Sequence, residues 1–170
     1  FISYAQGEGK QERIVKIFNN ALLIHNVLAV MTVVILVIAG FFFFNGVLNI
    51  PDGKFADAMF VYGCLLVTTV FSITVAPYEA AINAHENMLF YSVVGVTDVV
   101  LKFGIALGIL FCDGDKLVIY AVLMSAEALA MRFASQVYCR RKYEECRRAN
   151  ILRHYEKSVV KEMLSFTGWN

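Results

Sequence analysis

Proline is scarce in this chain, and so are charged side chains. Only 2 of the 170 residues are proline and 17% are charged, against about 25% charged residues in an average soluble domain. Hydrophobic residues make up 59%, above the roughly 45–50% of soluble chains. The formal net charge of +1 gives no reason to expect a nucleic acid as partner. The composition therefore predicts an integral membrane protein.

The motifs of enzymes and metal-binding proteins are also missing from the sequence. No Cys-x-x-Cys pair, zinc-type histidine pair, phosphate-binding glycine loop or Ser-His-Asp pattern occurs. We therefore expect a protein that is not an enzyme and that holds no metal and no cofactor. The four cysteines are scattered, and we expect free thiols at Cys64, Cys112, Cys139 and Cys146.

A secretory signal peptide is missing as well, because the N-terminal residues are polar and hold no apolar core beside a cleavage site. The chain begins at Phe1 rather than Met and ends at Asn170, just after an apolar patch. We expect it to be a piece of a longer protein.

Four apolar segments are each long enough to cross a bilayer, which takes about 20 residues of helix for roughly 30 Å of hydrocarbon. The connections between them are short, so neighbouring segments must be antiparallel. The segments are too long and too uniformly apolar for the strands of a membrane β-barrel. The sequence therefore predicts an all-α, polytopic transmembrane helical bundle. Its spans are expected at about 21–44, 58–83, 89–112 and 117–139.

Lysine and arginine are distributed unequally, and this predicts the orientation of the bundle. Of the 15 such residues, 11 lie before the first span or after the fourth. The two loops expected at the opposite end hold only Lys54 and Lys116. Because positive charge is enriched in cytoplasmic segments, we expect both ends of the chain to be cytoplasmic.

Charged side chains also fall inside the third and fourth spans, at Asp98, Lys102, Glu127 and Arg132. A charge at the bilayer centre costs roughly 2.5–3.5 kcal/mol, so such groups are usually paired or face a wet interior. When the chain is folded about its DGDK turn, Lys102 matches Glu127 in depth. Asp98 matches Arg132 to within about 1.5 Å. The sequence predicts oppositely charged pairs between these spans, either as structural ion pairs or as the lining of a translocation cavity.

The stretch APYEAAINAHENMLFY combines a proline with a polar stripe at the end of the second span. Pro77 removes a backbone hydrogen-bond donor and can kink the helix. Glu79, Asn83 and Glu86 follow at spacings of four and three, which places them on one helical face. We interpret Pro77, Glu79, Asn83 and Glu86 as candidates for a cytoplasmic gate, with an ordinary solvated face as the alternative.

Residues 140–170 are expected to form a cytoplasmic basic helix and then an amphipathic helix at the membrane interface. The amphipathic part, 158–167, has apolar side chains on one face, and Phe166 and Trp169 would be its aromatic anchors. It is expected to lead into a further span outside this chain. The basic residues are interleaved with glutamates, so we expect no nucleic-acid partner.

Four stretches taken together resemble one family. They are FISYAQGEGKQERIVKIFNNALLIH, VAPYEAAINAHENMLFYSVVGVTDVVLK, YCRRKYEECR and KEMLSFTGWN. Over essentially its whole length the sequence resembles the bacterial lipid-linked oligosaccharide flippases of the multidrug/oligosaccharidyl-lipid/polysaccharide exporter superfamily. Members have twelve to fourteen helices in two pseudo-symmetric lobes. The resemblance implies a MATE-like fold in which residues 1–139 are helices three to six, in the N-terminal lobe.

The resemblance also implies a function in polysaccharide biosynthesis. An undecaprenyl-diphosphate-linked oligosaccharide, such as an O-antigen or capsule repeat unit, would be flipped across the bacterial inner membrane by alternating access around a cationic cavity. Lys102 and Arg132 would attract the lipid diphosphate. Asp98 and Glu127 would balance these cations, or bind a coupling cation or proton. The implied partners are the lipid bilayer, the lipid-linked oligosaccharide and the remaining helices of the full-length protein.

Three other interpretations stay open. The first is a multidrug or cation antiporter of the same superfamily. The second is a membrane-embedded glycan polymerase or ligase that uses Asp98 or Glu127 as an acid. The third is a scaffold without transport, which would tolerate the loss of Asp98 or Lys102.

Overall fold

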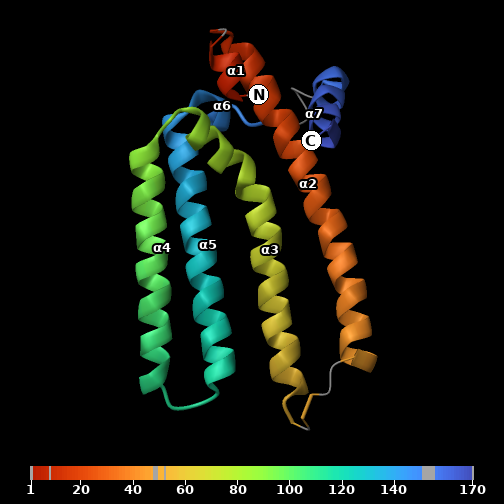
Figure 1. Ribbon diagram of the computed structural model, residues 1–170, viewed down its shortest axis with the longest axis vertical. Coiled ribbons are helices and arrows are strands. Elements are labelled where there is room, and N and C mark those ends of the chain that lie inside the picture. Colours follow the sequence, from red (N-terminus) through yellow and green to blue (C-terminus); the bar gives the residue numbers. More distant parts are fainter. Residues whose placement is uncertain (1, 8, 48–49, 52, 151–155, 170) are drawn as a thin grey trace.

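Helices make up all the regular structure that the computed structural model contains in its described residues, 2–7, 9–47, 50–51, 53–150 and 156–169. Figure 1 shows four long helices in antiparallel order, with the short helices and both chain ends gathered at one end. In chain order the elements are α1 (Ile2–Gly7), α2 (Gln11–Phe42), a π-helical turn (Phe43–Val47), α3 (Phe55–Ala84), α4 (Met88–Gly108), a 3-10 turn (Ile109–Phe111), α5 (Lys116–Lys142), α6 (Glu144–Arg147) and α7 (Lys157–Trp169).

Four helices are long and apolar enough to cross a membrane: Gln11–Gly46, Phe55–Ala84, Met88–Phe111 and Lys116–Lys142. The prediction of an all-α bundle with four such helices is confirmed. The second, third and fourth helices begin and end within a few residues of the predicted spans. The first begins at Gln11 rather than near residue 21, because its polar N-terminal turns continue the helix beyond the apolar segment.

Polar residues fix the ends of α4 and α5. The Asn87 side chain accepts a hydrogen bond from the backbone N–H of Phe90 at 3.3 Å and so caps the start of α4. Asp115 caps α5 in the same way, accepting from the N–H of Leu117 at 3.1 Å. The α5 helix ends at Lys142 because Tyr143 adopts an extended backbone conformation, with φ −112° and ψ 134°. These caps satisfy backbone donors that a helix start leaves unpaired.

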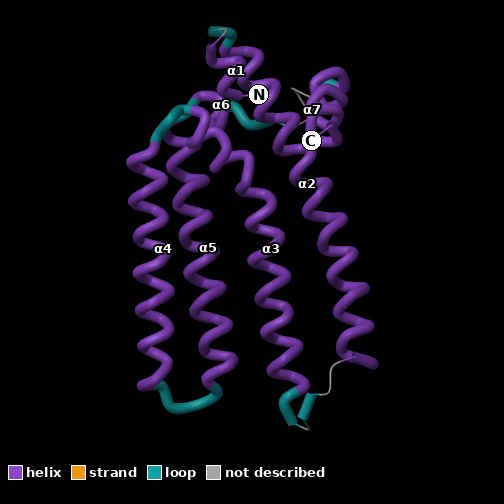
Figure 2. Tube along the Cα trace, viewed as in Figure 1, coloured by secondary structure: helices purple, strands orange, loops and turns teal. Residues whose placement is uncertain are grey.

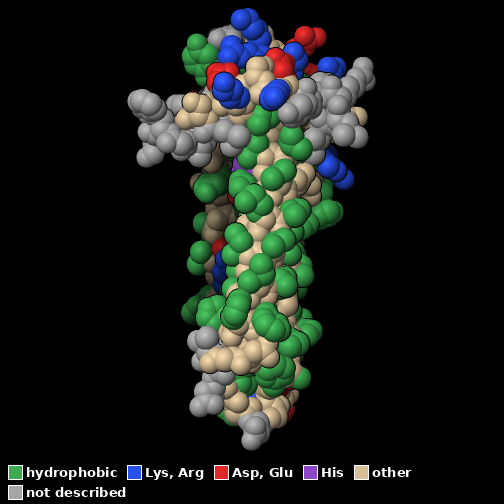
Figure 3. Space-filling model, turned by 90° about the vertical axis from the view of Figure 1, so that its right-hand side faces the viewer, with side chains coloured by type: hydrophobic (Ala, Val, Ile, Leu, Met, Phe, Trp, Pro, Cys, Tyr) green, Lys and Arg blue, Asp and Glu red, His purple; other side chains and the backbone are tan. Residues whose placement is uncertain are grey.

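The buried core lies at one end of the molecule, which we call the head: α1, α6, α7 and the adjoining ends of α2, α3 and α5 (Figure 1). By contrast, no more than 11% of each apolar window in the four long helices is buried. Figure 3 shows hydrophobic side chains over the long helices and charged side chains concentrated in the head. This division suits a protein whose long helices face hydrocarbon and whose head packs like a water-soluble core. The core residues are Ile2, Ala5, Ile14, Ile17, Phe18, Leu22, Val75, Tyr78, Ala81, Ile82, Cys139, Tyr143 and Cys146.

Helix α3 is central among the long helices, since it contacts both α2 and α5, while α4 packs on α5. Away from the head, Gly40 lets α2 approach α3 closely: a Cβ there would lie 2.6 Å from the Cε1 atom of Tyr62. The Tyr62 hydroxyl donates a hydrogen bond to the carbonyl of Leu36 at 2.5 Å. Small residues are typical of such contacts, because transmembrane helices associate through close packing and interhelical hydrogen bonds.

At the end opposite the head, Lys54 joins the two connections that Figure 2 shows there. Its ammonium group lies 3.1 Å from a carboxylate oxygen of Asp57 and also pairs with Asp115. The hydrogen bond from Lys54 lowers the pKa of the Asp115 carboxyl. Both side chains are partly exposed, so this pair contributes little to stability. It does hold the α2–α3 connection beside the start of α5.

A disulfide joins Cys139 and Cys146, with their Cα atoms 5.9 Å apart. The expectation of free thiols is therefore wrong for this pair, and it is confirmed for Cys64 and Cys112. In one continuous helix, seven residues would separate the two Cα atoms by about 10 Å. The chain instead turns at Tyr143, and the turn brings Cys146 back beside Cys139.

The expected long basic helix after residue 140 is also interrupted, because α5 ends at Lys142 and α6 is a separate helix of 4 residues. The amphipathic segment at 158–167 lies within α7, which packs against α2. Val159 of α7 contacts the head core. The side chains of the expected anchors, Phe166 and Trp169, lie outside the described part of the structure.

Candidate functional site

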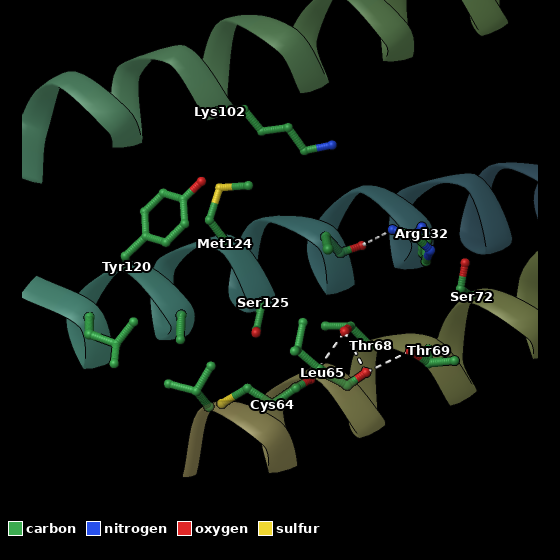
Figure 4. A pocket seen from close by; sticks show the side chains of 14 residues that line it. Cys64, Leu65, Thr68, Thr69, Ser72, Lys102, Tyr120, Met124, Ser125 and Arg132 are labelled. Carbon is green, nitrogen blue, oxygen red and sulfur yellow. Dashed lines mark hydrogen bonds between the residues drawn. The ribbon is translucent and has the colours of Figure 1, made fainter. Parts of the chain in front are cut away.

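A cavity of about 510 Å³ lies among α3, α4 and α5, within the length of the apolar helices. Figure 4 shows Lys102 reaching into it from α4 and Arg132 facing it from α5. Both belong to helices that are long and apolar enough to cross a membrane. The other residues that line it are Val61, Cys64, Leu65, Thr68, Thr69, Ser72, Leu117, Tyr120, Ala121, Met124, Ser125 and Ala128.

The α3 side of the cavity carries hydroxyl groups (Figure 4). The Thr68 hydroxyl donates to the carbonyl of Cys64 at 3.1 Å, and the Thr69 hydroxyl donates to the carbonyl of Leu65 at 2.7 Å. Backbone carbonyls are the usual partners of Thr in such helices, and each bonded oxygen can still accept from a ligand. Together with the two cations, these oxygens give the cavity a polar surface within the apolar length of the helices.

The closest ion pair in this region lies within one helix. The ammonium group of Lys102 donates to the Asp98 carboxylate at 2.7 Å, and both side chains are partly exposed. Asp98 and Lys102 are four residues apart, so they share one face of α4 and can pair without the help of a second helix.

The prediction that ion pairs join α4 to α5 is therefore wrong, because Lys102 pairs with Asp98 of its own helix. Among the described residues, no ion pair joins Lys102 to Glu127 or Asp98 to Arg132. Glu127 and Arg132 are five residues apart, which turns their side chains about 140° from each other around α5. Matching depth along two helices is thus insufficient to define which side chains meet. The structure does bring Lys102 and Arg132 to one cavity and Asp98 and Arg132 to another.

Arg132 lies between two cavities. It lines the 510 Å³ cavity and also a smaller one of about 190 Å³, which Glu79, Asp98 and Ser135 line as well. One guanidinium nitrogen donates to the carbonyl of Ala128 in its own helix at 3.2 Å. A guanidinium group has five N–H donors, so Arg132 keeps donors for a ligand in either cavity.

Glu127 is the most deeply buried of the four charged residues, with 7% of its surface exposed. Neither of its carboxylate oxygens accepts a hydrogen bond from a donor in the described residues. The other acid of this region, Asp98, pairs with Lys102 of its own helix at 2.7 Å. Among the described residues, the cavity thus has two cations on its surface, and Glu127 is not one of its lining residues.

The candidate gate residues do not form one surface. Pro77 is buried inside α3, and Glu79 lines the smaller cavity with Asp98 and Arg132. Asn83 is exposed, and α3 ends at Ala84. Glu86 lies beyond that end in a turn with φ 52°. The spacing would place Glu86 on the same helical face as Glu79 and Asn83 only if α3 continued to residue 86. Because α3 ends at Ala84, Glu86 does not lie on that face.

A polar network in the head escaped the sequence analysis. The Nε2 atom of His85 lies 2.5 Å from a carboxylate oxygen of the buried Glu145, and the His85 ring stacks on Tyr143. Asn87 donates to the Tyr138 hydroxyl at 2.6 Å. These contacts join the α3–α4 turn to the α5–α6 turn. Sixty residues separate His85 from Glu145, so no local pattern could indicate the pair.

In the described part of the chain, no group of three or more His, Cys, Asp or Glu side chains is arranged to hold a metal ion. Comparison with family models, curated proteins and solved structures gives no match. The interpretation of the site therefore rests on the residues of this chain.

Proposed function

We propose that this chain is part of a membrane transporter that moves an undecaprenyl-diphosphate-linked oligosaccharide across the bacterial inner membrane. In this proposal its four long helices are helices three to six, in the N-terminal lobe of a MATE-like exporter. The observation that carries the proposal is the polar cavity that presents Lys102 and Arg132 among helices long and apolar enough to cross a membrane. The sequence resemblance points to the same class of substrate.

The chemistry of the cavity supports an anionic headgroup. A diphosphate is rich in acceptor oxygens, and arginine binds such groups through paired N–H donors while lysine acts as a point charge. Keeping a cation at this depth costs roughly 2.5–3.5 kcal/mol on insertion scales. A bound diphosphate would offset that cost. Thr68 and Thr69 line the same cavity, so their hydroxyl groups are available to the diphosphate as well.

The direction of transport follows from the charge distribution. The head gathers both ends of the chain and most of its lysine and arginine residues (Figures 1 and 3). The positive-inside rule then assigns the head to the cytoplasm. The cavity lies beyond the head along the helices, where a lipid headgroup that enters from the inner leaflet would be received and passed outward by alternating access.

A multidrug or cation antiporter is the second candidate, because the packed helices α4 and α5 each carry a carboxyl group, Asp98 and Glu127. The accessible surface of the larger cavity favours the first candidate. Among the described residues, Lys102 and Arg132 line that cavity and no acidic side chain does, so it would repel a cationic drug.

The full-length protein tests the proposal in cells that make a lipid-linked oligosaccharide and lack its flippase. We expect the protein to restore the surface glycan and to remove the lipid-linked precursor that accumulates on the cytoplasmic side. Resistance to cationic drugs should stay unchanged in the same cells. Drug efflux without restored glycan would support the antiporter instead.

A further inference from the structure

We propose that the stacked rings of Phe90 and Tyr138 are a gate that closes the two cavities on the side of the head. This inference rests on the proposed function and deepens it, since it names the contact that must open before a headgroup can enter from the cytoplasmic side. The gate lies close to the stretch in which the sequence predicted one, but it is made of other residues.

The two cavities follow one another along the helices. The smaller one, of about 190 Å³, is lined by residues from the head-side parts of three helices, among them Ile82 of α3, Phe90 of α4 and Ser135 of α5. The larger one, of about 510 Å³, extends away from the head to residues such as Cys64. Arg132 lines both, so the cavities adjoin at its side chain. A solute that comes from the head therefore meets the smaller cavity first.

The contact between Phe90 and Tyr138 joins α4 to α5 at the head end of the smaller cavity. The two ring centroids lie 3.7 Å apart, and the ring planes differ by 11°. Among the residues of α4 that line the cavity, Phe90 is the nearest to the start of that helix. Figure 1 shows α4 and α5 side by side up to the head. The stacked rings therefore fill the seam between these helices on the side from which a solute would come.

Hydrogen bonds hold the Tyr138 ring in this position. The side-chain amide of Asn87 donates to the Tyr138 hydroxyl at 2.6 Å, and the ammonium group of Lys142 donates to it at 2.8 Å. Asn87 also accepts a hydrogen bond from the N–H of Phe90 as the cap of α4. The residue that fixes the start of α4 thus also fixes the ring that stacks on Phe90.

The α3 side of the smaller cavity is closed in a different way. Ile82 is buried and belongs to the head core. Phe90 and Tyr138 are only partly buried, at the edge of that core. Separating two half-buried rings exposes less new apolar surface than pulling out a core residue, so it costs less free energy. The seam between α4 and α5 is therefore the part that opens.

The reaction of Cys64 with a thiol reagent added on one side of the membrane tests the gate, because this free thiol lines the larger cavity. The protein is the full-length chain with its other free cysteines replaced by serine, in membrane vesicles that expose the head side. The reagent is a small, membrane-impermeant methanethiosulfonate that carries a sulfonate. Phe90→Ala should raise the rate about twofold to tenfold, the range for the loss of an aromatic pair. Tyr138→Phe keeps the ring and loses the hydroxyl contacts, so it should raise the rate less.

Phe103→Ala is the matched control, since it removes a ring of α4 that is 65% exposed, and it should react like the wild type. Phe90→Leu keeps an apolar side chain without a ring, and it serves with the same expected rise if Phe90→Ala does not fold. Vesicles of the opposite orientation should give the same rate for every variant, which shows that the cavity is intact.

An unchanged head-side rate in the Phe90 variants would overturn the gate. A rise from both sides would overturn it as well, because it would show a general loosening of the bundle. Since the readout is labelling of a thiol, a failure of glycan export leaves it unaffected, and the two proposals can fail separately.

Discussion

Lys102→Gln should reduce export of the lipid-linked oligosaccharide about tenfold to a hundredfold in the full-length protein. A hydrogen bond to a charged group is worth about 1.5–3 kcal/mol, and each 1.4 kcal/mol is about a factor of ten in affinity. Lys102 reaches the cavity from α4 and has the only ammonium group that lines it in the described structure. The measurement is the rate at which surface glycan appears when expression is induced, at matched protein level.

Two further variants decide whether Lys102 acts on the substrate or only neutralises Asp98. Lys102→Gln leaves Asp98 without its 2.7 Å partner, which would impair the protein whatever the substrate is. Combining it with Asp98→Asn removes that unpaired charge. If the double variant regains normal export, Lys102 is structural and the proposed role is wrong. Lys116→Gln is the matched control, since it removes a lysine from the exposed start of α5.

Phe18→Ala should destabilise the folded protein by about 3–5 kcal/mol, the range for truncating a buried aromatic side chain. Phe18 is fully buried in the head core, and its ring meets the ring of Tyr78 edge-on at 5.2 Å between centroids. The alanine would leave a cavity where α2 packs against α3. Thermal unfolding of the purified full-length protein in detergent measures the effect.

Phe41→Ala makes the same change in the same helix at a position that is 66% exposed. Its ring meets the ring of Phe42 and is otherwise largely exposed, so the alanine removes few packing contacts. We expect a small change in unfolding temperature there and a large one for Phe18→Ala. Equal effects at the two positions would contradict the placement of the core in the head.

Hydropathy alone predicts the long helices, because every turn of a helix in hydrocarbon must carry mainly apolar side chains. The start of α2 was missed for a related reason. Residues such as Lys10 and Arg13 flank or begin the helix in the head, where packing rather than hydrophobicity stabilises it. Hydropathy reports only the part of a helix that lies in lipid.

The sequence predicts which charged residues lie inside the spans and at what depth. It does not predict which of them pair. Counting residues from the DGDK turn gives depth, and depth brought Asp98, Lys102, Glu127 and Arg132 to the same region. Rotation about each helix axis decides which of them meet, and it depends on how α4 packs against α5. The Asp98–Lys102 pair needs no such packing, because its two residues are four apart on one helix.

The head was the least predictable part. The Cys139–Cys146 disulfide depends on a turn at Tyr143. The His85–Glu145 contact depends on two turns, far apart in sequence, meeting in space. Neither has a periodic or spacing signal, because irregular backbone between helices is set by tertiary packing.

The central claim is that a water-accessible, cationic cavity lies among α3, α4 and α5, and Cys64 allows it to be tested directly. Cys64 is a free thiol, and it lines the cavity together with Lys102 and Arg132. In a Cys112→Ser background it is the only free cysteine among the described residues. The measurement is its rate of reaction with two thiol reagents of similar size, one carrying a sulfonate and one a quaternary ammonium.

We predict that the sulfonate reagent reacts several-fold faster at low salt, because a cationic cavity concentrates anions. The preference should shrink at high salt through screening, and Lys102→Gln should reduce it. Faster reaction with the ammonium reagent, or no reaction of Cys64 with either reagent, would contradict the account.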